Sequence, residues 1–274
     1  MKRILVPTDF SKQAENALKV AAQIAKKIGS EIYVLNSLEL PLHLASSNET
    51  SSKPESLFFI QLSKKYFEEL LKKPYLEGLL IHEAIMGHGE VYDDVNNVIE
   101  EKDIDLVIMG SHGNNGFMEM FIGSNTEKVV RTSKAPVLVI KNDHVEFKTK
   151  NFVYATDFSE ESKKPFIEVQ KIATTIESHL NLLYVNTPGD FKTTSEINEK
   201  IADFVKDITV EDYSITIYND TSVERGILNF AKDSDAHLLG MGTHGRKGLS
   251  HFFNGSVSED LVNHANMPVI TFKI

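Results

Sequence analysis

Short apolar runs alternate with longer amphipathic segments along the whole chain. Residues 3–8 are mostly apolar and are predicted to form a strand. The next segment, to Ile28, repeats apolar residues at helical spacing. Ser11 comes before that segment and Gly29 follows it, which predicts a helix with a serine N-cap and a glycine C-cap. Most apolar runs are continuous rather than alternating, which indicates strands of a parallel sheet that is covered on both faces.

The same pattern predicts four further strands and three further helices in the first half. The strands are expected at 31–38, 79–86, 104–110 and 136–141, and the helices at 55–73, 90–101 and 124–132. The second half repeats this order, with a shorter second helix near 195–206. The polar stretch 45–54 is expected to form a loop, and the charged stretch 141–150 a linker.

Three motifs occur twice and in the same order. Pro7-Thr8-Asp9-Phe10-Ser11 is answered by Ala155-Thr156-Asp157-Phe158-Ser159, 148 residues further on. The segments 109–113 and 136–140 return 132 residues further on. The chain is therefore a duplication whose first copy is 16 residues longer, and we expect domains at 1–143 and 150–274.

Composition narrows the class of protein. The 274 residues are 41% hydrophobic and 25% charged, which suits two soluble domains. Acidic residues outnumber basic ones, 39 to 29, which argues against partners such as nucleic acid or anionic membranes. The absence of cysteine excludes disulfides, thiolate metal sites and cysteine nucleophiles. Asp9 interrupts the first apolar run and no run nears the roughly 18 residues of a membrane span, so we expect a cytoplasmic protein.

Glycines follow the fourth predicted strand in both copies. They read Gly110-x2-Gly113-x9-Gly123-Ser124 and Gly242-x2-Gly245-x9-Gly255-Ser256. Such glycines let backbone amides approach an anion, and the last Gly-Ser opens a helix whose N-terminus favours phosphate. Ligands of parallel α/β sheets also bind at the carboxyl ends of strands. The alternative is that the glycines form tight turns that let helices pack onto the fourth strand.

Other candidate motifs are weaker. The segment Gly240 to Gly245 matches a dinucleotide fingerprint, but it follows a fourth strand, and Ile108 replaces Gly240 in the first copy. No P-loop sequence occurs, and the ten histidines lack metal-ligand spacing. His112 and His244 recur between the copies, and we expect them to orient the glycine loop rather than to act in catalysis.

Taken together, these motifs resemble the universal stress protein family. The resemblance rests on the glycine spacing, the Met-Gly-Ser/Thr-His-Gly segments, the Pro-Thr-Asp-Phe-Ser opening and the Ala-Pro-Val-Leu-Val closing strand. It covers nearly the whole chain twice, as in tandem members. It implies two α/β domains, each a five-stranded parallel, doubly wound, Rossmann-like sheet. In the nucleotide-binding branch it also implies ATP as ligand, with any Mg²⁺ held through the phosphates.

The resemblance also assigns a nucleotide site to each copy. Asp9 and Asp157 are expected near the ribose and base, while Ser37 and Val185 meet adenine through their backbone. In the first copy the expected binding residues are Pro7, Thr8, Asp9, Ser37, Met109, Gly110, His112, Gly113, Gly123, Ser124 and Asn125. In the second they are Ala155, Thr156, Asp157, Val185, Met241, Gly242, His244, Gly245, Arg246, Gly255, Ser256 and Val257.

The two glycine loops differ in charge. The second loop carries Arg246 and Lys247, whereas the first carries Asn114 and Asn115 at the same places. Because cations strengthen phosphate binding, we expect the second site to bind ATP more tightly. The alternative is that the two cations are only solvated loop charges. Asn125, where the second copy has Val257, also departs from the family pattern in the first site.

Three functions follow from these observations. No nucleophile–base pair is evident, so the leading hypothesis is a nucleotide-dependent regulatory or stress-response protein without efficient turnover. The second is a slow ATPase or autophosphorylating protein, and the third an interaction module with structural or no nucleotide. The family resemblance further implies edge-to-edge pairing of the closing strands, 136–141 and 268–274, as an intramolecular pseudo-dimer; assembly into a homodimer is left open.

Overall fold

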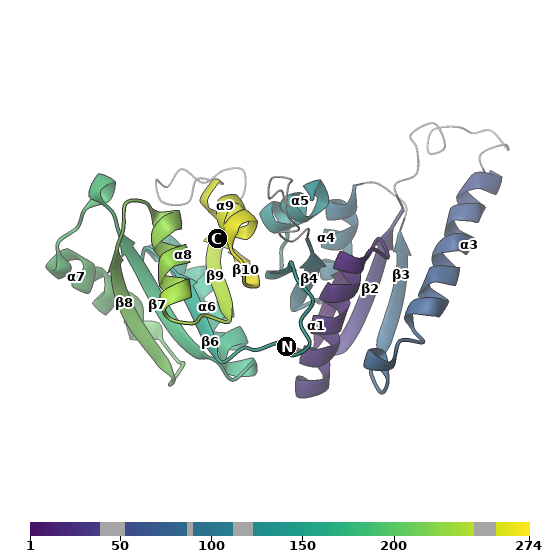
Figure 1. Cartoon of the computed structure of the whole chain (residues 1–274), viewed down its shortest axis with the longest axis horizontal. Coiled ribbons are helices and arrows are strands. Elements are labelled where there is room, and N and C mark those ends of the chain that lie inside the picture. Colours follow the sequence, from purple (N-terminus) through teal and green to yellow (C-terminus); the bar gives the residue numbers. More distant parts are fainter. Residues whose placement is uncertain (39–52, 87–89, 112–122, 244–255) are drawn as a thin grey trace.

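The two halves of the chain share one ten-stranded sheet (Figure 1). The computed structural model describes residues 1–38, 53–86, 90–111, 123–243 and 256–274. The strands of the first half are β1 (Arg3–Pro7), β2 (Glu31–Ser37), β3 (Ile81–Met86), β4 (Leu106–Gly110) and β5 (Val137–Ile140). Those of the second half are β6 (Asn151–Ala155), β7 (His179–Asn186), β8 (Tyr213–Asn219), β9 (Leu238–Thr243) and β10 (Val269–Lys273).

Helices connect the strands of each half. They are α1 (Lys12–Ile28), α3 (Lys53–Leu70), α4 (Val91–Lys102), α5 (Ser124–Thr132), α6 (Glu160–Thr175), α7 (Thr194–Phe204), α8 (Val223–Asp233) and α9 (Ser256–His264). Short 3-10 turns lie at Pro74–Leu76, Pro188–Asp190 and Val205–Asp207. In α1 the Ser11 side chain accepts from the amide of Ala14, and Gly29 ends the helix at φ 73°. Both ends of α1 are therefore where the sequence predicts them.

The strand order is β3-β2-β1-β4-β5-β10-β9-β6-β7-β8. Neighbouring strands are parallel within each half, and β5 and β10 are antiparallel to each other, with Leu138 opposite Ile270 and Val139 opposite Val269. Strand direction thus reverses once, at the junction of the two halves. Each half is a parallel, doubly wound α/β sheet, which confirms the predicted fold class.

Each face of the sheet carries a core that continues through both halves. One core contains buried side chains of α1, α3, α6 and α7, and the other contains side chains of α4, α5, α8 and α9. Leu138 and Ile270 belong to the first core, and Val139 and Val269 to the second. The paired strands therefore join the two halves by apolar burial on both faces as well as by backbone hydrogen bonds.

Lys141 adds a polar contact at this junction. It follows β5, and its Nζ donates to the carbonyls of Asn263 and Ala265, at 2.6 and 2.7 Å, at the end of α9. These two bonds give partners to carbonyls at the helix end, which have none within the helix. Lys273 is the last residue of β10 and lies 132 residues after Lys141 in the sequence; its Nζ lies 3.5 Å from the carbonyl of Thr132 at the end of α5.

One expectation needs correction. Lys53 and Pro54, predicted in a loop, begin α3, and the rest of the predicted loop, 45–52, lies outside the described residues. The 18-residue α3 is longer than the 11-residue α7, so part of the extra length of the first copy is helical.

The first glycine of the segment that matches a dinucleotide fingerprint, Gly240, lies within β9. A Cβ on Gly240 would come 2.5 Å from the ring of Phe152, so this glycine permits core packing.

We predict that Lys141 makes the free energy of unfolding depend on pH in the alkaline range. Burial lowers the pKa of Lys141 to about 8, whereas an unfolded lysine titrates near about 10.4. Between these values the unfolded chain holds a proton that the folded chain has lost, so this group makes the free energy of unfolding rise with pH. Urea denaturation gives the free energy of unfolding of the unmodified chain and of Lys141→Gln at about pH 7.5 and at about pH 10. From the lower to the higher pH, the value of the unmodified chain should rise relative to that of the variant. Parallel changes in the two proteins would contradict this account.

Candidate functional site

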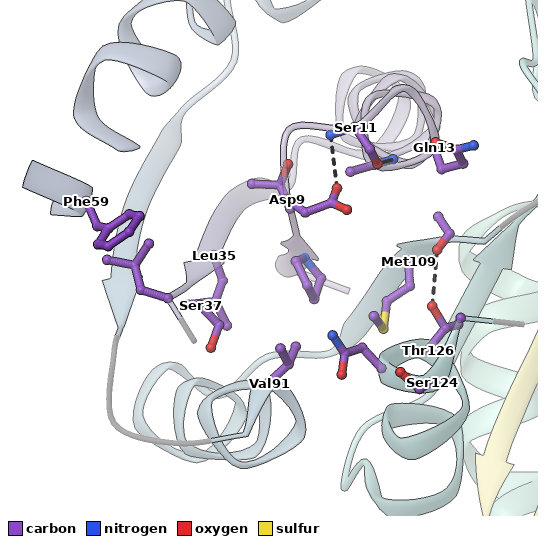
Figure 2. Close-up of a pocket in the computed structure, with 17 residues that line it drawn as sticks. Asp9, Ser11, Gln13, Leu35, Ser37, Phe59, Val91, Met109, Ser124 and Thr126 are labelled. Carbon is purple, nitrogen blue, oxygen red and sulfur yellow. Dashed lines mark hydrogen bonds between the residues drawn. The ribbon is translucent and has the colours of Figure 1, made fainter. Parts of the chain in front are cut away.

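A cavity of about 530 Å³ lies at the carboxyl ends of β1, β2 and β4 (Figure 2). This is the edge where ligands of parallel α/β sheets are expected. The residues that line it are Pro7, Thr8, Asp9, Ser11, Gln13, Ala14, Leu35, Ser37, Leu38, Phe59, Val91, Met109, Gly110, Gly123, Ser124, Asn125 and Thr126.

One end of the cavity is mainly apolar. Leu35 and Ser37 come from β2 and Leu38 follows it, while Phe59 comes from α3 and Val91 from the start of α4. Figure 2 shows the labelled side chains of this group at one end, away from Ser124 and Thr126. Ser37 is the polar member of these five, and its hydroxyl donates to the carboxylate of Asp94. This end suits a flat, largely apolar group with a polar edge.

A strained turn after β1 presents Asp9 to the cavity. Phe10 has φ 61°, a conformation that is uncommon for a bulky residue. The turn is held because the amide of Phe10 donates to Thr8 Oγ1 at 2.9 Å, and the Phe10 ring contacts Tyr66 and Phe67 of α3. Asp9 Oδ1 accepts from the amide of Ser11 at 2.9 Å (Figure 2). The Asp9 carboxylate is thereby fixed in direction while it remains exposed.

The second domain repeats this turn with one difference. Phe158 has φ 55°, and its amide donates to Thr156 Oγ1. Asp157 Oδ1 accepts from the amide of Ser159 at 3.0 Å and also from the hydroxyl of Ser162 at 2.7 Å. In the first domain Ala14 occupies the position of Ser162, so Asp9 lacks the second of these bonds. The Asp157 carboxylate is more firmly bound to its own domain than that of Asp9.

The opposite end of the cavity is formed by the start of α5. Gly123 is the N-cap and makes no side-chain hydrogen bond to the first turn of the helix, which begins at Ser124. The amides of this first turn have no carbonyl partner within the helix, and they lie at the positive end of its dipole. Thr126 Oγ1 donates to the carbonyl of Gly110 at 3.2 Å, which ties this turn to the end of β4. The arrangement can bind an anion such as phosphate.

The glycines of the repeated motif differ in their surroundings. A Cβ on Gly110 would lie 2.2 Å from the carbonyl oxygen of Gln13, at the start of α1. A Cβ on Gly242 would meet the flexible end of Ile274 at 2.7 Å, and one on Gly123 would meet none of the described residues within 4 Å. Gly110 is therefore required for close packing of β4 on α1, which is the structural role that the sequence left open, although it also lines the cavity.

The structure brings together many of the predicted first-domain residues. Nine line the cavity: Pro7, Thr8, Asp9, Ser37, Met109, Gly110, Gly123, Ser124 and Asn125. In the second domain, the expected residues at the ends of β6, β7 and β9 are Ala155, Thr156, Asp157, Val185, Met241 and Gly242. Ser256 and Val257 begin α9. Outside the described residues lie His112, Gly113, Asn114, Asn115, His244, Gly245, Arg246, Lys247 and Gly255.

Sequence reasoning missed other lining residues. They are Ser11, Gln13, Ala14, Leu35, Leu38, Phe59, Val91 and Thr126. The apolar members look like ordinary core residues in the sequence, and only the tertiary position of α3 brings Phe59 to the cavity. Thr126 could have been found, since it lies in the first turn of the predicted helix 124–132.

The described residues show no sign of a metal site or of a membrane span. No group of three or more His, Asp or Glu side chains that could hold a metal ion was found there. His82, in β3, lies 3.2 Å from Glu31 and stacks on Tyr33. Within the same residues, no helix is long and apolar enough to cross a membrane.

We predict that alanine destabilises the fold much more at Gly110 than at Gly123. Gly110→Ala should lower the free energy of unfolding by about 1–3 kcal/mol or more, because the new methyl group overlaps backbone that cannot move freely. Gly123→Ala should change it by less than about 1 kcal/mol, since the site is open and φ is −56°. Urea denaturation of both variants tests the pair. Equal losses would mean that the contact with Gln13 does not limit residue 110.

Comparisons with known proteins agree with this architecture. The model of the universal stress protein family matches residues 1–141 and again residues 148–273. Universal stress protein MJ0577 of Methanocaldococcus jannaschii is 30% identical over 154 residues, which cover 51% of this chain and 94% of that protein. Universal stress protein Slr1230 of Synechocystis is 21% identical over 297 residues and spans 100% of both chains.

A solved structure shows the same fold over both domains. The crystal structure of a universal stress protein from Archaeoglobus fulgidus superposes with a TM-score of 0.75 at 22% identity, and the match covers 99% of this chain and 98% of that one. The family match extends over nearly the whole chain in two separate copies. The chain is a tandem, two-domain member of the universal stress protein family.

Proposed function

We propose that this chain is an ATP-binding regulatory protein of the stress response, and that its first-domain cavity holds the nucleotide. One observation carries the proposal. A single cavity has an apolar end, a fixed carboxylate at its middle and the uncapped N-terminus of α5 at its other end. This order matches the base, ribose and phosphates of a nucleotide.

Each part of the cavity suits its part of ATP. Leu35, Leu38 and Val91 offer apolar contact to the faces of adenine, and the ring of Phe59 can stack on it. The Asp9 carboxylate can accept from the ribose hydroxyls. The amides at the start of α5 can donate to the phosphates, where the helix dipole also favours negative charge. Any Mg²⁺ would be held mainly by the phosphates, with Asp9 as the nearby carboxylate.

The proposed role is binding without efficient turnover. The sequence shows no evident nucleophile–base pair, and no dedicated pair of carboxylates to hold Mg²⁺. We therefore propose a nucleotide-dependent regulatory role rather than an ATPase. The antiparallel pairing of β5 with β10 supports the further proposal that the two domains act as an intramolecular pseudo-dimer.

The first test is the nucleotide content of the freshly purified protein. Denaturation followed by ion-exchange chromatography of the supernatant should release adenine nucleotide, one per chain if one domain binds and two if both bind. A protein that is empty and also refuses added ATP would contradict the proposal and favour an interaction module.

We predict that Gly123→Asp weakens ATP binding without weakening the fold. Aspartate is a favoured N-cap, so its carboxylate should bond to the first-turn amides and keep α5 stable. The same carboxylate would occupy those amides and repel the phosphates, so the Kd of the first-domain site should rise about tenfold or more. Isothermal titration calorimetry gives Kd and stoichiometry, and thermal unfolding reports on the fold.

Gly123→Asn is the matched control for this prediction. Asparagine caps about as well as aspartate and has nearly the same shape, but it carries no charge. Its effect on the ATP Kd should be clearly smaller. If both variants bind ATP as the unmodified chain does, the phosphates are not at the start of α5.

We also predict that the second domain binds ATP more tightly than the first. Arg246 and Lys247 supply cations to its glycine loop, where the first domain has Asn114 and Asn115. Gly245→Val should therefore remove the tighter of two titration phases, and Gly113→Val the weaker. Equal losses of affinity from the two variants would overturn this ranking of the sites.

A further inference from the structure

Two positions near the apolar end of the cavity differ together between the domains. In the first domain, Ser37 donates to the carboxylate of Asp94, which lies in the first turn of α4 and is only 1% exposed. The same positions in the second domain are Val185 and Gly226, at offsets of 148 and 132 residues. A Cβ on Gly226 would lie 2.5 Å from Val185 Cγ1. A hydrogen-bonded pair in one domain is thus a close-packed apolar pair in the other.

The two members of each pair depend on each other. Valine in place of Ser37 would take the hydroxyl donor away from the buried carboxylate of Asp94, and an unpaired buried charge is costly. An aspartate at 226 would overlap Val185. The two domains therefore have alternative residue pairs at this place. Only the pair of the first domain includes a polar side chain, that of Ser37, in the cavity wall.

The pair fixes the hydrogen-bonding character of Ser37. A carboxylate accepts hydrogen bonds and cannot donate, so the one proton of the Ser37 hydroxyl is committed to Asp94. The lone pairs of Ser37 Oγ remain, which makes the hydroxyl an acceptor toward the cavity. The other lining residues of this end are the apolar Leu35, Leu38, Phe59 and Val91. Figure 2 shows the labelled ones, Leu35, Phe59 and Val91, at the same end of the cavity as Ser37.

From this geometry we infer that Ser37, positioned by Asp94, makes the first-domain cavity selective for 6-aminopurines over 6-oxopurines. The inference rests on the proposed function, that this cavity holds a purine nucleotide with its base at the apolar end. The 6-amino group of adenine donates a hydrogen bond, whereas the 6-oxo group of guanine or hypoxanthine accepts one. A 6-oxo group would leave two acceptors facing each other away from water, and such unpaired groups lose affinity.

The second domain lacks this device. Val185 and Gly226 provide no side-chain acceptor at the matching place, so the side chains of these two positions add nothing to base selection beyond the backbone contact expected of Val185. The duplication therefore yields one domain with a side-chain reader of the purine C6 substituent and one without it.

The test compares ATP with inosine triphosphate, which carries oxygen in place of the 6-amino group. Hydrogen–deuterium exchange, titrated with each nucleotide, reports on the first domain through peptides from β1, α4 and α5. In the unmodified chain, inosine triphosphate should need a concentration about tenfold or more higher than ATP for equal protection. Ser37→Ala should reduce this ratio about fivefold or more, chiefly by weakening ATP.

The Asp94→Asn variant tests whether Asp94 acts by orienting the Ser37 hydroxyl or only by packing beside it. An asparagine amide can donate to Ser37 Oγ and release the hydroxyl proton, which could then donate to a 6-oxo group. The ATP preference should fall because inosine triphosphate binds better, an effect that simple loss of stability would not produce. Ser63→Ala is the matched control, since Ser63 donates to Asn36 Oδ1 beside β2 but does not line the cavity. It should leave the ratio unchanged.

The outcomes separate the two proposals. If ATP protects the first domain but Ser37→Ala keeps the ratio of the unmodified chain, the selectivity inference is wrong and ATP binding stands. If neither nucleotide protects the first domain of the unmodified chain at any concentration tested, the proposed function of that cavity fails, and the inference fails with it. A ratio that falls equally in Ser63→Ala would also overturn the inference, because the effect would then be a general one of β2.

Discussion

The antiparallel pairing of β5 with β10 is the interaction on which the rest of the architecture depends. Each half alone would end in an apolar strand with an unpaired edge, and such edges invite aggregation. Pairing Leu138 with Ile270 and Val139 with Val269 removes both edges and extends each core across the junction. Lys141 also bonds to carbonyls at the C-terminal end of α9, and the N-terminal end of this helix follows the second glycine motif. The junction therefore contacts a helix of the proposed nucleotide site of the second domain.

The duplication gives an internal comparison that separates framework from chemistry. Both domains keep the strained phenylalanine, Phe10 or Phe158, and the threonine and aspartate bonds that hold its turn. Strain of this kind persists only where surrounding contacts fix it, and here aromatic neighbours from α3 or α7 do so. The features that differ, such as the bond from Ser162 to Asp157, adjust how freely each aspartate can meet a ligand.

The sequence predicts local features well and tertiary ones poorly. Ser11 and Gly29 mark α1 because caps act within one turn, and the apolar runs reveal the strands because burial on both faces leaves a continuous pattern. Nine first-domain residues of the candidate site follow from family resemblance at strand ends and the glycine motif. Phe59 does not, because its position depends on how α3 packs. The pairing of Ser37 with Asp94 spans 57 residues, and only an alignment of the two copies with each other hints at it.

The glycine motif illustrates why a motif alone does not establish a ligand. Gly110 is required whether or not a nucleotide binds, because any side chain there would overlap the carbonyl of Gln13. A Cβ on Gly123 would meet none of the described residues within 4 Å, and the backbone angles of Gly123 suit any residue, so packing against the described part of the chain does not demand a glycine. What a side chain at 123 would change is access to the α5 amides from the cavity. Glycine at 123 is therefore the member of the motif that packing against the described residues does not explain, and access of a phosphate to the α5 amides would explain it.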